Sequence, residues 1–153
     1  MTEIITEPPA PAPAAKETKA QKMERLKREL NPWEAFDEVR KFAREGRGSI
    51  TPEWISAYFR WWGIYTQGDG VGAVGGSGGE GKASEYFMMR IGVPNGVLHS
   101  PQVRKIAEIT QRYTRNMADI TTRQNIQMHW LTIESLPEVV GLLATVGLSS
   151  RGA

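Results

Sequence analysis

Between Gly68 and Gly81, eight of the fourteen residues are glycine, and this segment separates two parts of the chain that differ in hydrophobic periodicity. Before it, apolar residues recur every three or four positions, which is typical of helices. After it, apolar and polar residues alternate, which is typical of strands. So much glycine leaves few side chains to pack, and we expect a Gly-rich loop over residues 68–84. The pattern predicts an α+β fold in which N-terminal helices precede a sheet.

The glycine segment also matches a dinucleotide-binding fingerprint in the Gly-Val-Gly-Ala-Val-Gly run at 70–75. That fingerprint binds a pyrophosphate only where a strand leads through a tight turn into a helix, and here more glycine follows. No acidic residue stands at the distance that binds a ribose hydroxyl. We therefore interpret the segment as a flexible loop that could close over a ligand, and not as a nucleotide site.

The 153-residue chain is long enough for one domain, and its 40% of apolar residues exclude a wholly disordered chain. Nineteen basic and seventeen acidic residues leave a net charge of +2, which is too small for the basic field of a nucleic-acid-binding protein. No apolar run approaches the roughly 20 residues of a membrane-spanning helix, and the acidic, proline-rich N-terminus does not resemble a signal peptide. We expect a cytoplasmic protein that binds neither nucleic acid nor membrane.

Cysteine is absent, which excludes disulfides, thiolate nucleophiles and cysteinyl metal sites in this chain. The two histidines, His99 and His129, are too few for a zinc cage. The chain therefore predicts no metal site of its own.

Four prolines among alanines predict a disordered Pro/Ala tail over residues 1–15. Residues 16–67 are expected to form a helical N-terminal segment. Its first helix, over 16–30, carries six basic and three acidic residues beside a thin apolar stripe. This pattern favours a solvated helix, with docking of an acidic partner or anionic surface as the alternative.

Two further helices are indicated by a capping residue followed by proline, at Asn31-Pro32 and at Thr51-Pro52. We expect the first to end near Gly46 and the second before Gly63. Their apolar residues recur at helical spacing, which favours a packed core over stacking on a ligand. These residues are Trp33, Phe36, Val39 and Phe42 in the first helix, and Trp54, Ile55, Tyr58, Phe59 and Trp62 in the second.

Residues 85–153 predict strands over 86–93, 118–122 and 125–133, with helices beginning at Ser100 and Ser135. In the first strand Phe87, Met89, Ile91 and Val93 share one face and Arg90 lies on the other. The order β-α-β-β-α matches the ferredoxin-like unit β-α-β-β-α-β without its final strand. We therefore expect a truncated ferredoxin-like half-domain in a chain that is a fragment.

The alternation also places Gln127, His129, Leu131 and Ile133 on one face of the last strand, with Arg90 and Arg123 on or beside neighbouring strands of the same sheet. Two converging guanidinium groups favour an anion site, because arginine stays charged and its fork fits carboxylates and small oxyanions. The alternative is that both arginines pair with Asp119, Glu85 or solvent. His129 by itself is more typical of a hydrogen-bonded core histidine than of a ligand or acid.

Two segments, Tyr86-Phe-Met-Met-Arg-Ile-Gly-Val-Pro-Asn-Gly96 and Ala118-Asp-Ile-Thr-Thr-Arg-Gln-Asn-Ile-Gln-Met-His129, resemble the signature segments of the sirohaem-containing nitrite and sulfite reductases. Arg-Trp-Trp-Gly-Ile-Tyr65 and Val146-Gly-Leu-Ser-Ser150 are also similar to that family. The resemblance covers roughly residues 31–153. It implies a fold of two ferredoxin-like halves related by a pseudo-twofold axis, of which this chain resembles the opening part.

The resemblance also implies residue roles. Arg90 matches the catalytic arginine that faces the oxyanion on the distal side of sirohaem, and Arg123 matches one that binds the carboxylates of the macrocycle. Gln127 and His129 match cofactor-binding residues beside the tetrapyrrole. Thr122 and Asn125 lie in the same motif without an implied role. Where family members often carry a second basic residue, this chain has Gly92.

The implied activity is the six-electron reduction of nitrite to ammonia, with ferredoxin as the expected electron donor. Sulfite reduction to sulfide is the alternative, and a second alternative is an inactive fragment that binds sirohaem or a partner subunit. The family also holds a [4Fe–4S] cluster through four cysteines in the C-terminal part of the reductase. Because such a cluster requires thiolates, this chain alone cannot hold one and is expected to be inactive by itself.

Overall fold

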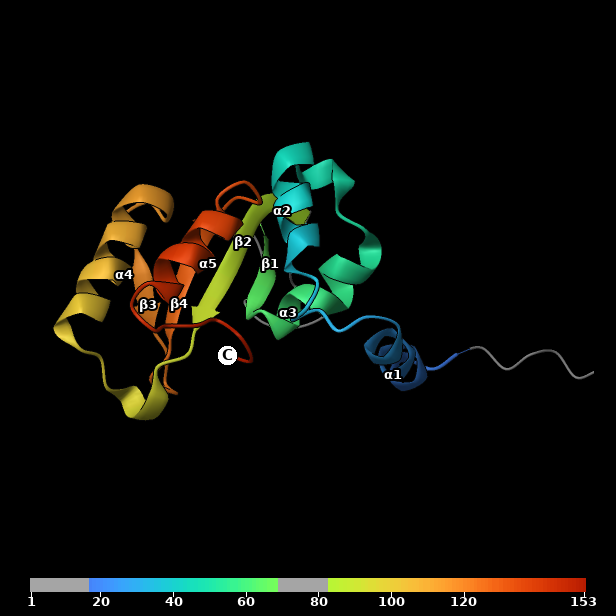
Figure 1. The fold of residues 1–153 in the computed structure, drawn as a ribbon, viewed down its shortest axis with the longest axis horizontal. Helices are drawn as coiled ribbons and strands as arrows, with labels where there is room; N and C mark the ends of the chain where they lie inside the picture. The colour runs from blue at the N-terminus through green and yellow to red at the C-terminus, as the bar shows by residue number, and fades with distance from the viewer. Residues whose placement is uncertain (1–16, 69–82) are drawn as a thin grey trace, which may run out of the picture.

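The computed structural model describes residues 17–68 and 83–153 (Figure 1). The Pro/Ala tail over 1–15 and most of the Gly-rich loop over 68–84 lie outside the described residues. Helices are α1 (Lys19–Glu29), α2 (Phe36–Glu45), α3 (Phe59–Trp61), α4 (Ser100–Tyr113) and α5 (Leu136–Ala144). Strands are β1 (Ile64–Gly68), β2 (Ala83–Ile91), β3 (Ala118–Ile120) and β4 (Ile126–Leu131).

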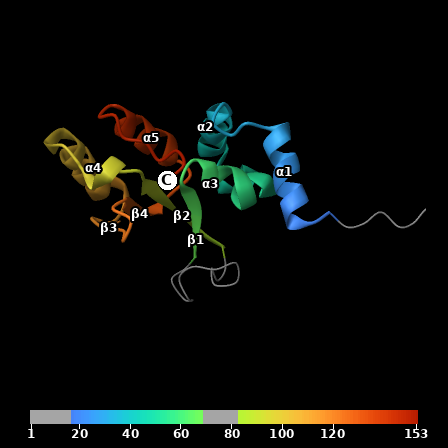
Figure 2. The same ribbon diagram turned by 90° about the horizontal axis from the view of Figure 1, so that it is seen from below.

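The four strands form one antiparallel sheet in the order β1-β2-β4-β3. Along the chain, β2, α4, β3, β4 and α5 follow the predicted order β-α-β-β-α, so the ferredoxin-like half-domain is present. Figures 1 and 2 show α4 and α5 side by side on one face of the sheet. None of the helices in the described residues is both long enough and apolar enough to span a membrane.

The fourth strand of the sheet was not predicted. Residues 64–67 were assigned to the helical segment, but Ile64–Gly68 forms β1 and pairs with β2 through Ile64↔Met89 and Thr66↔Phe87. Helix α3 ends just before Gly63, whose φ of +63° turns the chain into the strand. The three residues Ile64, Tyr65 and Thr66 have high strand propensity. They form too short a run before the glycines for periodicity to distinguish a strand from a helix.

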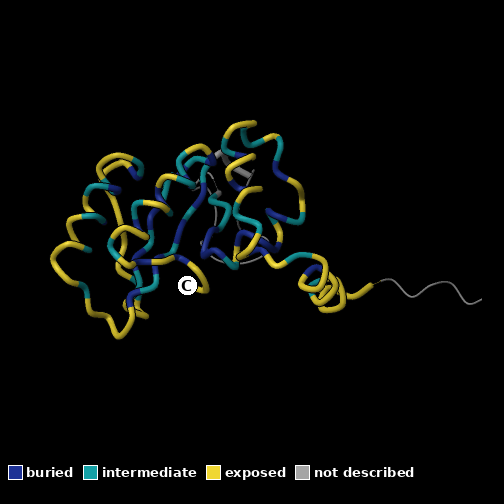
Figure 3. The backbone as a smooth tube through the Cα atoms, viewed as in Figure 1, coloured by how far each residue is buried: buried dark blue, intermediate teal, exposed yellow. Residues whose placement is uncertain are grey.

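The core connects the N-terminal helices to the sheet. Phe87, Met89, Ile91 and Val93 are buried on the helix-facing side of β2, as their alternation predicts. The aromatic stripe of the second predicted helix is also core, since Trp54, Tyr58, Phe59 and Trp62 are buried. The rings of Phe59 and Phe87 lie 5.3 Å apart between their centroids and join the two parts. In contrast to these buried segments, α1 is largely exposed (Figure 3).

The predicted helix start at Asn31 is corrected by the structure. Asn31 Oδ1 accepts a hydrogen bond from the backbone N–H of Trp33 at 3.2 Å, which caps a separate turn, and α2 begins only at Phe36. The helix opened by Thr51-Pro52 contains a π-helical turn over Trp54–Tyr58 before α3. Both helices end as expected, at Gly46 and at Gly63.

Gly63 lies where three segments meet. Its carbonyl accepts a hydrogen bond from the Arg90 backbone N–H at 2.8 Å. A Cβ at this position would approach the carbonyl oxygen of Ser150 to 2.3 Å and that of Arg90 to 2.9 Å. The segment after α5 crosses here and is held by Gly152, whose N–H donates to the Trp61 carbonyl at 3.0 Å. A side chain at position 63 would therefore separate β2 from this segment.

We predict that Gly63→Ala lowers the free energy of unfolding by about 2–4 kcal/mol, because it adds left-handed strain to a backbone clash. Urea denaturation measures the change. Gly141→Ala is the matched control, since Gly141 lies in α5 and its added Cβ meets nothing within 4 Å. The control is expected to be neutral or stabilising by up to about 1 kcal/mol. Equal stability of the Gly63 variant and the unchanged chain would contradict this packing.

The contact between α1 and the rest of the protein predicts a pH dependence. The Tyr58 hydroxyl donates to the Leu26 carbonyl at 3.2 Å, and burial raises the pKa of Tyr58 above its ordinary value of 10.0. Because the pKa of Tyr58 is raised in the folded state, the protonated tyrosine contributes stability below about pH 10. This contribution is lost as the pH rises through the raised pKa. Thermal unfolding between pH 8 and 11 should show this loss. Tyr58→Phe should reduce the slope, leaving the part due to Tyr113, whose pKa burial also raises.

Candidate functional site

The side of the sheet opposite α4 and α5 carries polar and aromatic side chains, and we call it the open face. The strand register places Arg90 beside Gln127 and Gln127 beside Asp119, so these three residues form a row across β2, β4 and β3. Arg90, Gln127 and His129 are half-buried. The residues assigned to the open face by alternation and register are Tyr65, Tyr86, Met88, Arg90, Asp119, Gln127 and His129.

Arg90 is a half-buried cation on the open face. Its guanidinium carbon lies 5.4 Å from the ring centroid of Tyr65, and its Nε is buried without a hydrogen-bond partner. A buried donor without a partner costs free energy, more so on a charged group. Among the side chains that the structure describes, none forms an ion pair with Arg90. This arrangement favours an anion as the missing partner.

One alternative predicted that Asp119 pairs with the two arginines. Among the described side chains, Asp119 forms no ion pair with either of them. Its Oδ2 lies 3.1 Å from His129 Nε2, so the carboxylate is in contact with the imidazole. The side chain of Glu85, the other proposed partner, lies outside the described residues. The carboxylate orients the His129 ring and leaves Nδ1 for a further contact. In the described residues no three His, Asp or Glu side chains are grouped to bind one metal ion.

A β-bulge in β4 overturns part of the predicted alternation. Met89 pairs with Met128 and Phe87 with Leu131, so His129 and Trp130 together lie opposite Met88. Trp130 has φ = 67°, and its N–H donates to Gln67 Oε1 at 2.8 Å.

The extra residue reverses the facing of everything after it. Leu131 and Ile133 are therefore buried in the core, at 0% and 1% exposure, and do not share a face with Gln127 and His129.

Arg123 lies in the hairpin loop between β3 and β4. Gln124 takes the left-handed conformation that closes such a loop, with φ = 66°. Thr121 Oγ1 accepts hydrogen bonds from the N–H groups of Arg123 and Asn125. Asn125 Oδ1 accepts from the Val93 N–H at 3.1 Å and ties the loop to the end of β2. Arg123 is exposed, and no described side chain pairs with it.

The structure therefore places Arg90, Gln127 and His129 on the open face, and Arg123 in the hairpin at one end of it. Ile91 pairs with Ile126, so the hairpin that carries Arg123 lies next to the end of β2 that carries Arg90. Gln127 and His129 follow along β4 from that hairpin. The bulge and the role of Asn125 were missed, because neither leaves a periodic signal in the sequence.

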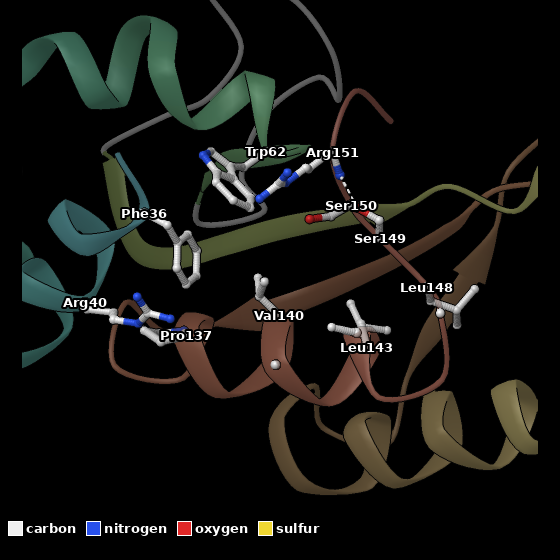
Figure 4. Close-up of a pocket in the computed structure, with 13 residues that line it drawn as sticks. Phe36, Arg40, Trp62, Pro137, Val140, Leu143, Leu148, Ser149, Ser150 and Arg151 are labelled. Atoms are coloured by element: carbon white, nitrogen blue, oxygen red, sulfur yellow. Dashed lines mark hydrogen bonds between the residues drawn. The ribbon is translucent and has the colours of Figure 1, made fainter. Parts of the chain in front are cut away.

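A groove of about 580 Å³ lies on the other side of the molecule, between α2, α5 and the segment after α5 (Figure 4). Its wall includes Phe36, Trp62 and Val140, and Arg151 lies over the Trp62 ring at 4.5 Å. Arg40 at its rim pairs with Asp37. None of the residues predicted to bind a ligand lines this groove, so the open face and not the groove is the candidate site.

Comparison with known proteins agrees with this fold. Residues 80–146 match the family model of the nitrite/sulfite reductase ferredoxin-like half domain. A sulfite reductase (ferredoxin) of Mycobacterium tuberculosis H37Rv is 35% identical over 135 residues, which are 85% of this chain and 24% of that protein. An assimilatory ferredoxin-dependent nitrite reductase of Haloferax mediterranei is 36% identical over 148 residues, 88% of this chain and 23% of that protein.

The solved structure of the Mycobacterium tuberculosis NirA protein matches with a TM-score of 0.76 at 34% identity, over 84% of this chain and 24% of that one. The fold is therefore that of a nitrite/sulfite reductase half-domain with an N-terminal helical extension. The chain belongs to the nitrite and sulfite reductase family. It spans about a quarter of the length of these relatives.

The hydrogen bond from Val93 to Asn125 sets the place of the hairpin. We predict that Asn125→Ala lowers the free energy of unfolding by about 1–3 kcal/mol, because it leaves the buried Val93 N–H without an acceptor. Thr122→Ala, at an exposed loop position, is the matched control and should change stability by less than about 0.5 kcal/mol. Urea denaturation measures both, and equal effects of the two variants would refute the role of Asn125.

Proposed function

We propose that this chain supplies the N-terminal part of a sirohaem-dependent reductase that converts nitrite to ammonia. The observation that carries the proposal is Arg90, a charged group with a buried, unpartnered Nε on the open face of a family half-domain. An oxyanion on the open face would meet the guanidinium of Arg90. The relatives named as nitrite and sulfite reductases support the reaction class. We expect the reductase to act in the cytoplasm.

The donor set of the open face fits a tetrapyrrole rich in carboxylates. Arg123 is exposed at one end with its guanidinium unpaired among the described residues, and suits a rim carboxylate. Gln127, beside Arg90, and His129, further along β4, present an amide and an imidazole. When bound, sirohaem would supply the iron at which the substrate is reduced. Arg90 would donate to the oxygen atoms of the substrate and stabilise charge as they leave.

A [4Fe–4S] cluster does not fit this chain, because the chain contains no cysteine. The proposed reductase therefore requires its remaining C-terminal part for the cluster. Ferredoxin is the proposed electron donor, in line with the names of several relatives. An inactive fragment that only binds sirohaem or a partner is the alternative for the chain taken alone.

Sulfite is the second candidate substrate. The Pro94-Asn95-Gly96 turn and the Thr-Thr-Arg-Gln-Asn segment favour nitrite, on the resemblance of these motifs to the nitrite branch. Sulfite remains a candidate substrate because Gly92 provides no second basic side chain beyond Arg90. The Gly92 N–H instead donates to the Ser149 carbonyl at 3.0 Å. Comparing nitrite and sulfite turnover by one preparation of the complete reductase decides between them.

Two substitutions separate the proposed roles in the complete reductase. Arg90→Ala should lower kcat for nitrite by about 100-fold, because one charged donor to the oxyanion is lost, while sirohaem absorbance per protein stays unchanged. Arg123→Ala should instead lower sirohaem occupancy, read from the visible spectrum. Arg44→Ala, on α2 away from the open face, is the control for removing an arginine. Unchanged nitrite kinetics in Arg90→Ala would overturn the proposal.

A further inference from the structure

A second cation reaches the open face from the loop between α4 and β3. The guanidinium carbon of Arg115 lies 4.1 Å from the ring centroid of Trp130 and 5.1 Å from that of Tyr86. The two rings meet edge to face, with centroids 5.6 Å apart and planes at 78°. Arg115 is exposed, so its charge remains accessible although its position is set by the two rings.

The backbone at both partners takes an unusual conformation. Arg115 and Asn116 have φ values of 54° and 62°, and Trp130 has 67°. Left-handed backbone costs free energy for residues other than glycine, so it persists only where the surroundings hold it. The Asn116 N–H donates to the Thr110 carbonyl at 3.2 Å, and Gln67 holds the N–H of Trp130. The stack of Arg115 on Trp130 is thus built into the loop and the bulge.

The hydrogen-bond donors of Arg115 have no partner among the described residues, neither a carboxylate nor a carbonyl. Stacking uses the faces of a guanidinium and leaves the N–H groups in its plane for an acceptor. Arg112, three residues earlier, differs: it pairs with Glu108 and Glu138. Arg115 is therefore a positioned cation with its fork unused, which suits a carboxylate.

Arg115 and Arg123 lie at opposite ends of the open face. Arg123 occupies the hairpin before β4, whereas Trp130 lies at the far end of that strand. The four residue steps from Ile126 to Trp130 span about 13 Å of strand. Gln127 and His129 lie between the two arginines. A flat ligand on this face would have Arg123 at one end and Arg115 at the other.

We propose that Arg115, held by Trp130 and Tyr86, binds a rim carboxylate of the tetrapyrrole at the end opposite Arg123. This inference rests on the proposed function, since it assigns a further contact to the same cofactor. A tetrapyrrole whose carboxylates surround its rim can meet cations at both ends of the sheet at once. Arg115 thereby extends the site beyond the two segments whose sequence resembles the family.

The test is a spectrophotometric titration of the full chain with iron uroporphyrin, an octacarboxylate tetrapyrrole. Arg115→Gln should weaken binding by about 10-fold, as expected for one charged hydrogen-bonding group. Arg115→Lys should lose less, because the charge remains and the fork does not. Arg112→Gln is the matched control: it removes an exposed arginine that lies 5.0 Å from the Tyr113 ring, and should change affinity by less than twofold.

The outcomes separate the two proposals. Tight binding by the unchanged chain together with unchanged binding by Arg115→Gln would overturn the role of Arg115 and leave the proposed function standing. No binding by the unchanged chain would overturn both. Equal losses in Arg115→Gln and Arg112→Gln would show a general charge effect and also overturn the inference. Circular dichroism of each variant before titration confirms that the fold is retained.

Discussion

The two-residue period of β2 determines which side chains form the core and which form the open face of the sheet. β2 is an inner strand that pairs with both β1 and β4, so its two faces become the two faces of the sheet. Phe87, Met89 and Ile91 join the core beneath the helices and fix the strand in register. The same alternation leaves Arg90 on the other face with a buried Nε. Packing on one side thus positions a charged donor on the other.

Much of this arrangement follows from the sequence. The alternation in β2, the order of strands and helices and the aromatic core of residues 54–62 are strong periodic signals, and the structure confirms them. Strand β1 was missed because its propensity signal is short and ends in glycine. The facing of Leu131 and Ile133 was wrong because one residue with left-handed backbone, Trp130, inverts the pattern. Nothing in residue type marks a tryptophan for that conformation.

The candidate site likewise combines residues that could be predicted from the sequence with contacts that could not. Arg90, Arg123, Gln127 and His129 could be predicted from the two segments that resemble the family; the structure places three of them on one face and Arg123 in the hairpin at its end. Their supports could not, since the Asn125–Val93 hydrogen bond and the Asp119–His129 contact join separate strands and loops. Arg115 lies outside both segments, and only the folded chain brings it to Trp130. Long-range contacts of this kind decide which cations face a ligand.

We propose that the open face, and not the groove between α2 and α5, binds the tetrapyrrole. NMR of the chain with zinc uroporphyrin, a diamagnetic octacarboxylate analogue, tests it directly through ring-current shifts. Large shifts are expected for the indole N–H of Trp130 and the side-chain amide of Gln127. The indole N–H of Trp62, which donates to the Pro32 carbonyl on the groove side, should stay in place. Shifts centred on Trp62 with Trp130 unaffected would contradict the account.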